Sequence, residues 1–282
     1  MIVSTQGAQA GAILIKWNLA STPSSPSGMW EVHTRLGGFV GSNLQKAQCA
    51  ASAASTTINN NCLAAYMSMW VSKTAAALYM ENLWLWTADH DVDDASLTQI
   101  TVYTGRGLYI ESTAGTLWLV GTAVEHHARY QYQLSGTQNI FMGQIQTETP
   151  YYQPNPAANN PLPQNSAIND PNFSTSCPAG AASNCPLAWG LRVSASSNIL
   201  VYGAGLYSFL NDYSTSCSAA GASTPCQAAI FMYDSAATKD LYVYNLNTVG
   251  TTGMVYRDTG KLATNIYNYN VYPSTIFFFR SS

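Results

Sequence analysis

The sequence predicts an all-β chain wound as a parallel β-helix, a solenoid in which the short strands of one coil stack on those of the next. Three observations support this fold class: a repeated strand pattern, Gly or Asn at the expected corners, and cysteine pairs that close loops between strands. Such a solenoid needs apolar strands that stack from coil to coil and residues that tolerate sharp turns. We assign residues 1–282 to a single domain of this kind.

Five short apolar segments carry the repeat. Each begins with Leu or Ile and ends near a small residue, and together they cover 78–82, 117–121, 140–144, 199–203 and 241–245. Four have Gly or Asn at the fifth position, and the segment at 140–144 has Gly at the fourth. The shortest interval is 23 residues, the length of one coil, so the longer intervals contain inserted loops. An irregular β-sandwich is the alternative that this pattern leaves open.

Loop insertions are expected at residues 150–186 and 211–228. The first is rich in Pro, and each contains a closely spaced cysteine pair. Six cysteines allow fifteen connectivities, of which local pairing is the simplest. It predicts three disulfides, Cys49–Cys62, Cys177–Cys185 and Cys217–Cys226. The CxxC spacing typical of zinc sites is absent.

Charge and hydropathy exclude several classes of function. The 282 residues are 47% apolar and 9% charged, with a net charge of −3, which is typical of a globular chain rather than a disordered one. The eleven Lys and Arg residues are scattered along the sequence, which argues against binding to nucleic acid. No apolar run reaches the roughly 20 residues needed to cross a bilayer, so no membrane partner is expected.

The cysteines and a glycosylation sequon predict an extracellular location. Disulfides persist in oxidising compartments, and Asn172 begins a sequon within the first insertion. Residues 1–4 lack the basic and apolar stretches of a signal peptide. We therefore predict a secreted protein whose export signal is not present in this chain.

Two glutamates are the candidate chemical centre. Glu125 and Glu148 are 23 residues apart, one coil length, so they are expected to stack on adjacent strands about 4.8 Å apart at the backbone. Like charges at that distance raise the pKa of at least one carboxyl, which is how an acid stays protonated for general acid catalysis. The alternative is that each is a surface glutamate bonded to nearby Tyr and Gln side chains.

Aromatic residues accompany the glutamates. Sugar rings pack on aromatic faces, and the candidates for such a groove are Trp84, Trp86, Tyr130, Tyr132, Tyr151 and Tyr152. Core packing is the alternative for at least one tryptophan. Neither a metal nor a cofactor is expected. The Asp-rich run 89–94 lacks the Gly and Glu of a calcium loop, and His126 and His127 point to opposite faces if they lie on a strand.

Several motifs resemble glycoside hydrolase family 55, the fungal exo-β-1,3-glucanases. They lie at residues 28–38, 86–91, 109–112, 121–127, 144–152 and 202–208, and the resemblance covers nearly the whole chain. It implies a right-handed, pectate-lyase-like β-helix that corresponds to the C-terminal portion of a longer enzyme. Members of that family contain two tandem β-helices with the active site in the cleft between them.

The resemblance also implies an exo-acting, inverting hydrolase that releases glucose from β-1,3-glucans such as laminarin. It implies that Glu148 is the general acid, that Glu125 is the second catalytic carboxylate, and that Trp86, Asp89 and Tyr151 contact sugar; Gln146 is a further candidate for substrate binding. Carboxyls stacked one coil apart lie closer than the roughly 6.5–9.5 Å of an inverting acid and base. Glu125 is therefore expected to raise the pKa of the acid Glu148 and to help order the site. The N-terminal β-helix half is expected to hold the attacking water.

Two other functions remain open from the residues. A catalytically silent, carbohydrate-binding β-helix would keep the aromatic groove without the chemistry. A polysaccharide lyase on the same fold would need calcium or a basic residue as the base. Arg129 is the only cation near the carboxylate pair in the sequence.

Overall fold

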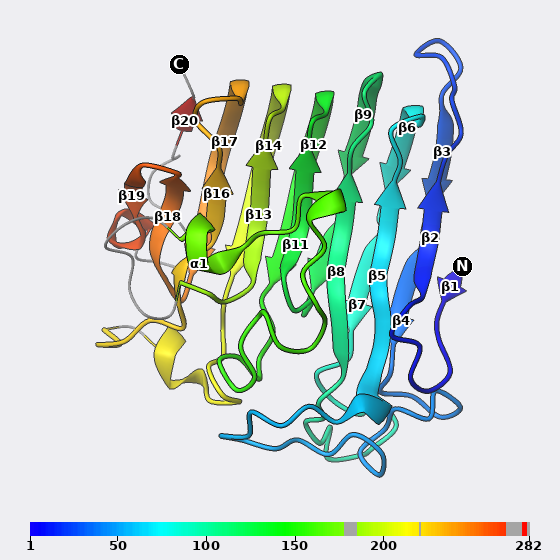
Figure 1. Cartoon of the computed structure of the whole chain (residues 1–282), viewed down its shortest axis with the longest axis vertical. Helices are drawn as coiled ribbons and strands as arrows, with labels where there is room; N and C mark the ends of the chain where they lie inside the picture. The colour runs from blue at the N-terminus through cyan, green and yellow to red at the C-terminus, as the bar shows by residue number, and fades with distance from the viewer. Residues whose placement is uncertain (178–184, 220, 269–277, 281–282) are drawn as a thin grey trace.

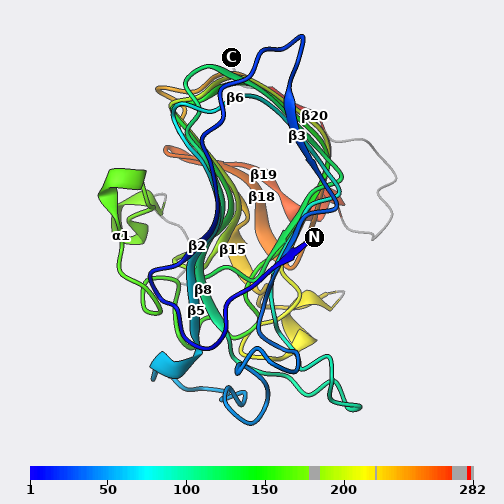
Figure 2. The same cartoon turned by 90° about the vertical axis from the view of Figure 1, so that its right-hand side faces the viewer.

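The computed structural model describes residues 1–177, 185–219, 221–268 and 278–280. Strands dominate it and run almost entirely parallel, each beside its counterpart from the neighbouring coil (Figure 1). In the perpendicular view, successive turns of the chain superpose on one another (Figure 2). The predicted all-β fold of stacked, parallel coils is confirmed, which removes the β-sandwich alternative. Its right-handedness and its single-domain assignment stay predictions.

One sheet contains two rows of short strands that merge into longer ones. The first row is β3 (Ser27–Trp30), β6 (Ala76–Glu81) and β9 (Gly115–Val120); the second is β1 (Ile2–Val3), β4 (His33–Leu36), β7 (Trp84–Thr87) and β10 (Ala123–Glu125). Both rows continue in β12 (Gln138–Glu148), followed by β14 (Ser197–Tyr207) and β17 (Lys239–Val249). The short β20 (Phe278–Arg280) pairs antiparallel with β17.

The second sheet closes the coils. Its strands are β2 (Ile13–Trp17), β5 (Leu63–Val71), β8 (Tyr103–Ile110), β11 (Tyr130–Ser135), β13 (Trp189–Ser194), β15 (Gln227–Ala229), β16 (Phe231–Tyr233), β18 (Thr251–Arg257) and the antiparallel β19 (Gly260–Thr264). Helical structure in the described residues is limited to α1 (Phe173–Ser176) and short 3₁₀ turns at Asn60–Cys62, Ser166–Ile168, Thr215–Ser218 and Asn265–Asn268. None of these helices has the length or apolar character to span a membrane.

The sequence repeat sets the register of the coils. The first residues of the five predicted segments pair directly, in the order Leu78, Leu117, Ile140, Ile199 and Leu241. All five side chains are at most 2% exposed and lie in the main apolar core. Each coil therefore buries an aliphatic side chain directly above that of the preceding coil, and the predicted repeat is confirmed.

The predicted corner positions adopt left-handed backbone in every one of these coils. The fifth residues of the segments, Asn82, Gly121, Gln144, Gly203 and Asn245, have φ between 52° and 80°. Gln144 was not expected here, because the sequence placed the corner residue of that segment at Gly143. The turn recurs at the same place in each coil, so geometry imposes the left-handed conformation even on a residue that tolerates it poorly.

All three predicted disulfides form, Cys49–Cys62, Cys177–Cys185 and Cys217–Cys226. The last two close the predicted insertions at 150–186 and 211–228, of which residues 178–184 and 220 lie outside the described ranges. The chain enters the first insertion directly after β12 and leaves it just before β13. Contacts that hold this insertion in place therefore also determine the path of the chain directly after Glu148.

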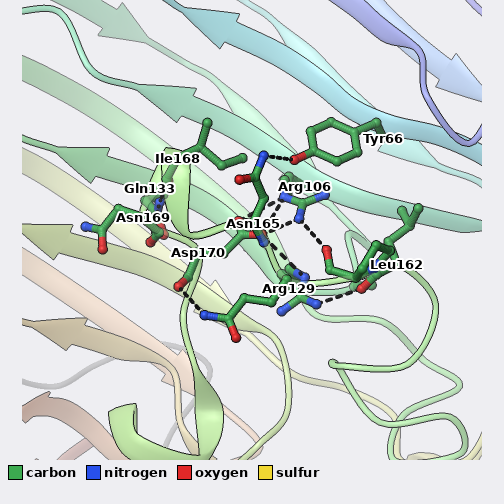
Figure 3. Close-up of polar contacts among 12 residues, drawn as sticks. Tyr66, Arg106, Arg129, Gln133, Leu162, Asn165, Ile168, Asn169 and Asp170 are labelled. Carbon is green, nitrogen blue, oxygen red and sulfur yellow. Dashed lines mark hydrogen bonds and ion pairs between the residues drawn. The ribbon is translucent and has the colours of Figure 1, made fainter.

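A buried ion-pair cluster fastens the first insertion to the second sheet (Figure 3). Asp170, in the insertion, accepts hydrogen bonds from Nε and Nη2 of Arg106 on β8, and its Oδ2 lies 3.8 Å from Nε of Arg129. Arg129 Nη2 also donates to the Leu162 carbonyl at 2.6 Å. The three charged side chains are at most 1% exposed. One carboxylate thus balances two guanidinium groups in the interior.

Asp170→Asn is expected to lower the free energy of unfolding by about 3–5 kcal/mol, because it leaves two buried guanidinium groups without a counter-charge. The matched control is Asp240→Asn, at an exposed left-handed position that Asn tolerates. That control should change stability by less than about 0.5 kcal/mol. Urea unfolding measures both, and equal losses would contradict the account of the cluster.

Gly115→Ala is expected to be much more destabilising than Gly136→Ala. Both glycines are left-handed, with φ of 67° and 60°, so both substitutions add backbone strain of about 1 kcal/mol. A Cβ at Gly115 would lie 1.8 Å from the Gln138 carbonyl oxygen, whereas Gly136 has nothing within 4 Å. The clash adds about 1–3 kcal/mol. Thermal and urea unfolding of the two variants should separate them, and similar losses would count against the close coil packing.

Candidate active site

Coil stacking brings the two candidate glutamates together. Glu125 at the end of β10 pairs directly with Glu148 at the end of β12. Trp86 pairs with Glu125 on its other side, and Tyr207 pairs with Glu148 on its other side. Adjacent strands are about 4.8 Å apart, so these four residues form one row across the coils. The predicted stacking of Glu125 on Glu148 is confirmed at the level of the backbone.

Glu125 is the more strongly perturbed carboxyl. Trp84 Nε1 donates a hydrogen bond to its Oε2 at 3.0 Å. Burial raises the pKa of Glu125, the charge of Glu148 raises it further, and His126 acts in the opposite direction. The expectation that at least one member of the pair has a raised pKa is therefore confirmed at Glu125, with burial as its largest cause.

Glu148 is held by two neighbours and remains accessible. Gln146 Nε2 donates to its Oε1 at 3.3 Å, and His126 Nε2 lies 3.4 Å from its Oε2. The Glu148 side chain is 28% exposed. The amide oxygen of Gln146 has no hydrogen-bond partner within the described part of the chain. The site therefore presents a reachable carboxyl beside a buried acceptor that has no partner in the described residues.

The other predicted sugar contacts differ in how far they reach the surface. Trp86 is 3% exposed, because it stacks on Trp84 with ring centroids 5.2 Å apart and packs beside His90 and Arg35. The Asp89 side chain is 27% exposed and bonds to His90 Nδ1 at 2.7 Å. Asp89 is thus available to a ligand, whereas Trp86 mainly supports the surface from below.

The tyrosines expected to surround the glutamates lie in the interior. Tyr130, Tyr132, Tyr151 and Tyr152 are all fully buried, so the expected aromatic groove is wrong in these four residues. Tyr151 and Tyr152 begin the first insertion and turn inward to join an apolar cluster that includes Trp86. The Tyr151 hydroxyl donates to the Ala88 carbonyl at 2.8 Å. Its position suits packing beneath His126 better than direct contact with a sugar.

The Asp-rich run and Arg129, the features considered for calcium binding and for a lyase base, make contacts within the protein. In the Asp-rich run, Asp91 accepts hydrogen bonds from Gln45 and the Lys46 backbone, and Asp94 pairs with Lys46. Over the described ranges no group of three metal-ligating side chains is close enough to hold an ion. Arg129 is 1% exposed within the Asp170 cluster, which counts against it as the base of a lyase.

His126 is the site residue that the sequence did not assign. It was considered only as a metal ligand, yet the structure places its ring between the Thr87 carbonyl and the Glu148 carboxyl. Its backbone φ is 67°, rare for a residue other than glycine. Its position next to Glu125 was the available signal in the sequence. The left-handed backbone of His126, with the ring directed at Glu148 on the next coil, cannot be predicted from that position alone.

Comparison with known proteins shows which enzymes the chain is similar to. No protein-family model matches the chain. It is 42% identical over 279 residues to a glucan 1,3-beta-glucosidase from Cochliobolus carbonum, covering 98% of this chain and 33% of that protein. It is 40% identical over 280 residues to a probable glucan endo-1,3-beta-glucosidase from Arthroderma benhamiae, covering 99% and 30%. The resemblance to the β-1,3-glucanases is confirmed. The chain spans about a third of the length of these curated relatives.

A solved structure supports the fold of this chain. It is described as a variant of sacteLam55A from Streptomyces sp. SirexAA-E in complex with glucose, and it superposes with a TM-score of 0.50 at 16% identity. The match covers 92% of this chain and 38% of the solved one. At this identity the likeness concerns the fold alone.

Proposed function

We propose that the protein hydrolyses β-1,3-glucan in an exo-acting, inverting reaction that releases glucose, with Glu148 as the general acid. The main support is the direct pairing of Glu125 with Glu148. Glu148 lies between Gln146 and His126, and its side chain remains accessible. Homology to proteins named as β-1,3-glucosidases supports the substrate class. The active unit in this proposal includes the N-terminal β-helix half implied by the resemblance.

In the proposed reaction Glu148 protonates the glycosidic oxygen as the bond to the anomeric carbon breaks. Water attacks from the opposite face of the sugar, which gives inversion. Glu125 lies on the neighbouring strand directly beside the acid, so it is poorly placed to activate water on the opposite face of the sugar. Its proposed role is electrostatic, and the N-terminal β-helix half of the proposed active unit supplies the groups that hold the water.

Substrate binding and location follow from the same set of residues. Asp89 and Gln146 are proposed to bind sugar hydroxyls, because the Asp89 side chain is 27% exposed and the half-buried Gln146 lies directly beside Glu148. Trp86 and Tyr151 are proposed to pack beneath these groups and to support them from the interior. Three disulfides are typical of an oxidising compartment, so we propose that the protein is secreted. The chemistry proposed here needs no cofactor.

Glu148→Gln in the full-length protein is expected to lower kcat on laminarin by about 10³-fold, because the amide cannot deliver a proton. Laminarin affinity should change little, since the substitution preserves shape. The matched control is Glu81→Gln, the same substitution in β6 of the same sheet. Glucose release measures activity, and a gel-retardation assay with laminarin measures binding.

The products separate the remaining alternatives. An inverting, exo-acting enzyme releases glucose as the α-anomer first, which NMR detects before mutarotation. A ladder of oligosaccharides would instead indicate endo action, and β-glucose would indicate retention. Wild-type protein that binds laminarin without any turnover would overturn the hydrolase proposal in favour of a silent carbohydrate-binding β-helix.

A further inference from the structure

We propose that His126 is a positioning residue for the general acid: its Nε2 holds the proton that Glu148 delivers to the glycosidic oxygen. This inference rests on the proposed function, since it assigns a task at the same carboxyl. It adds a second titrating group to the acid and predicts that the two act as one unit.

The hydrogen bonds of the ring fix which nitrogen carries which proton. His126 Nδ1 lies 2.9 Å from the Thr87 carbonyl oxygen, which can only accept, so Nδ1 must carry a hydrogen. Nε2 is therefore the nitrogen that gains or loses a proton, and it lies 3.4 Å from Glu148 Oε2. Any proton held at Nε2 points at the carboxyl that is proposed to act as the acid.

The surroundings hold the ring in this orientation. The His126 backbone N–H donates to the Glu148 carbonyl at 2.8 Å, which ties the two residues together across the coils. Tyr151 packs edge-on to the imidazole with ring centroids 5.2 Å apart, and its own hydroxyl is fixed on Ala88. His126 is 3% exposed and keeps a left-handed backbone. Strained residues of this kind cluster at functional sites.

Charge around the ring favours the imidazolium form. Burial alone would lower the pKa of His126, but its hydrogen bond to Glu148 and the charges of Asp89, Glu148 and Glu125 raise it to about 9. The other titratable groups against the ring are Tyr151 and the neighbouring His127. His127, buried beside Ser68 and Gln131, has its pKa lowered to about 3. Two adjacent histidines therefore differ in charge at neutral pH.

The proton inventory of the step balances. In the resting site Nε2–H donates to the Glu148 carboxylate. The Nε2 proton passes to Glu148 and from Glu148 to the glycosidic oxygen, which keeps the electron pair of the bond that breaks, so Glu148 ends the step as a carboxylate again. Neutral His126 keeps its Nδ1 hydrogen. Water forms the new bond to the anomeric carbon and releases one proton, and one proton from solvent restores the pair.

An NMR titration tests the pair without reference to activity. In ¹⁵N-labelled full-length protein, the Nε2 resonance of His126 should titrate near pH 9 and that of His127 should report a neutral ring throughout the neutral range. Glu148→Gln should move the His126 titration to lower pH, because burial then outweighs the remaining charges. A His126 that is already neutral at pH 7, or that ignores Glu148→Gln, overturns the inference even if the protein hydrolyses laminarin.

The pH profile of kcat/KM distinguishes proton holding from a structural role. His126→Gln keeps an amide near Glu148 and, as Gln144 shows, Gln is compatible with left-handed backbone in this chain. The alkaline limb should move to lower pH by about two units, with a loss of about 10-fold at pH 8. His127→Gln is the matched control and should leave that limb in place. Equal losses at every pH in His126→Gln would overturn the inference, whereas absence of turnover in a wild type that passes the NMR test would overturn the proposed function alone.

Discussion

The parallel, in-register pairing of successive coils is the constraint on which the rest of the structure depends. Each residue lies beside the corresponding residue of the next coil, so the sequence interval between two residues decides whether they touch. The same rule that stacks Leu117 on Ile140 in the core also stacks Glu125 on Glu148 at the surface. The carboxylate pair follows from the coil length and needs no special loop to assemble it.

This constraint has an electrostatic cost that the neighbouring side chains offset. Two carboxylates on adjacent strands repel, and burial of Glu125 adds to the difficulty of charging both. Trp84 donates to Glu125, Gln146 donates to Glu148, and His126 supplies a positive charge that acts on both carboxyls. These neighbours reduce the repulsion between the two glutamates. In the proposed mechanism they also determine which group holds the proton that the general acid delivers.

The repeat, the disulfides and the glutamate register could be predicted because each depends on local spacing. Gln144 shows the limit, since its left-handed backbone comes from the coil and not from the residue. The burial of Tyr151 could not be predicted, because it depends on the path of the insertion that Asp170 ties to Arg106. His126 was missed because its partners, Thr87 and Glu148, come from two other strands.

Cysteine cross-linking tests the central claim, the one-coil separation of Glu125 and Glu148, most directly. The six native cysteines are all paired, so an added pair reports only on its own separation. Glu125→Cys with Glu148→Cys should be bridged by a short bifunctional thiol reagent. Glu125→Cys with Tyr207→Cys, in the same row but two coils apart, should not be. Mass spectrometry that finds both pairs bridged equally, or only the second, would contradict the register.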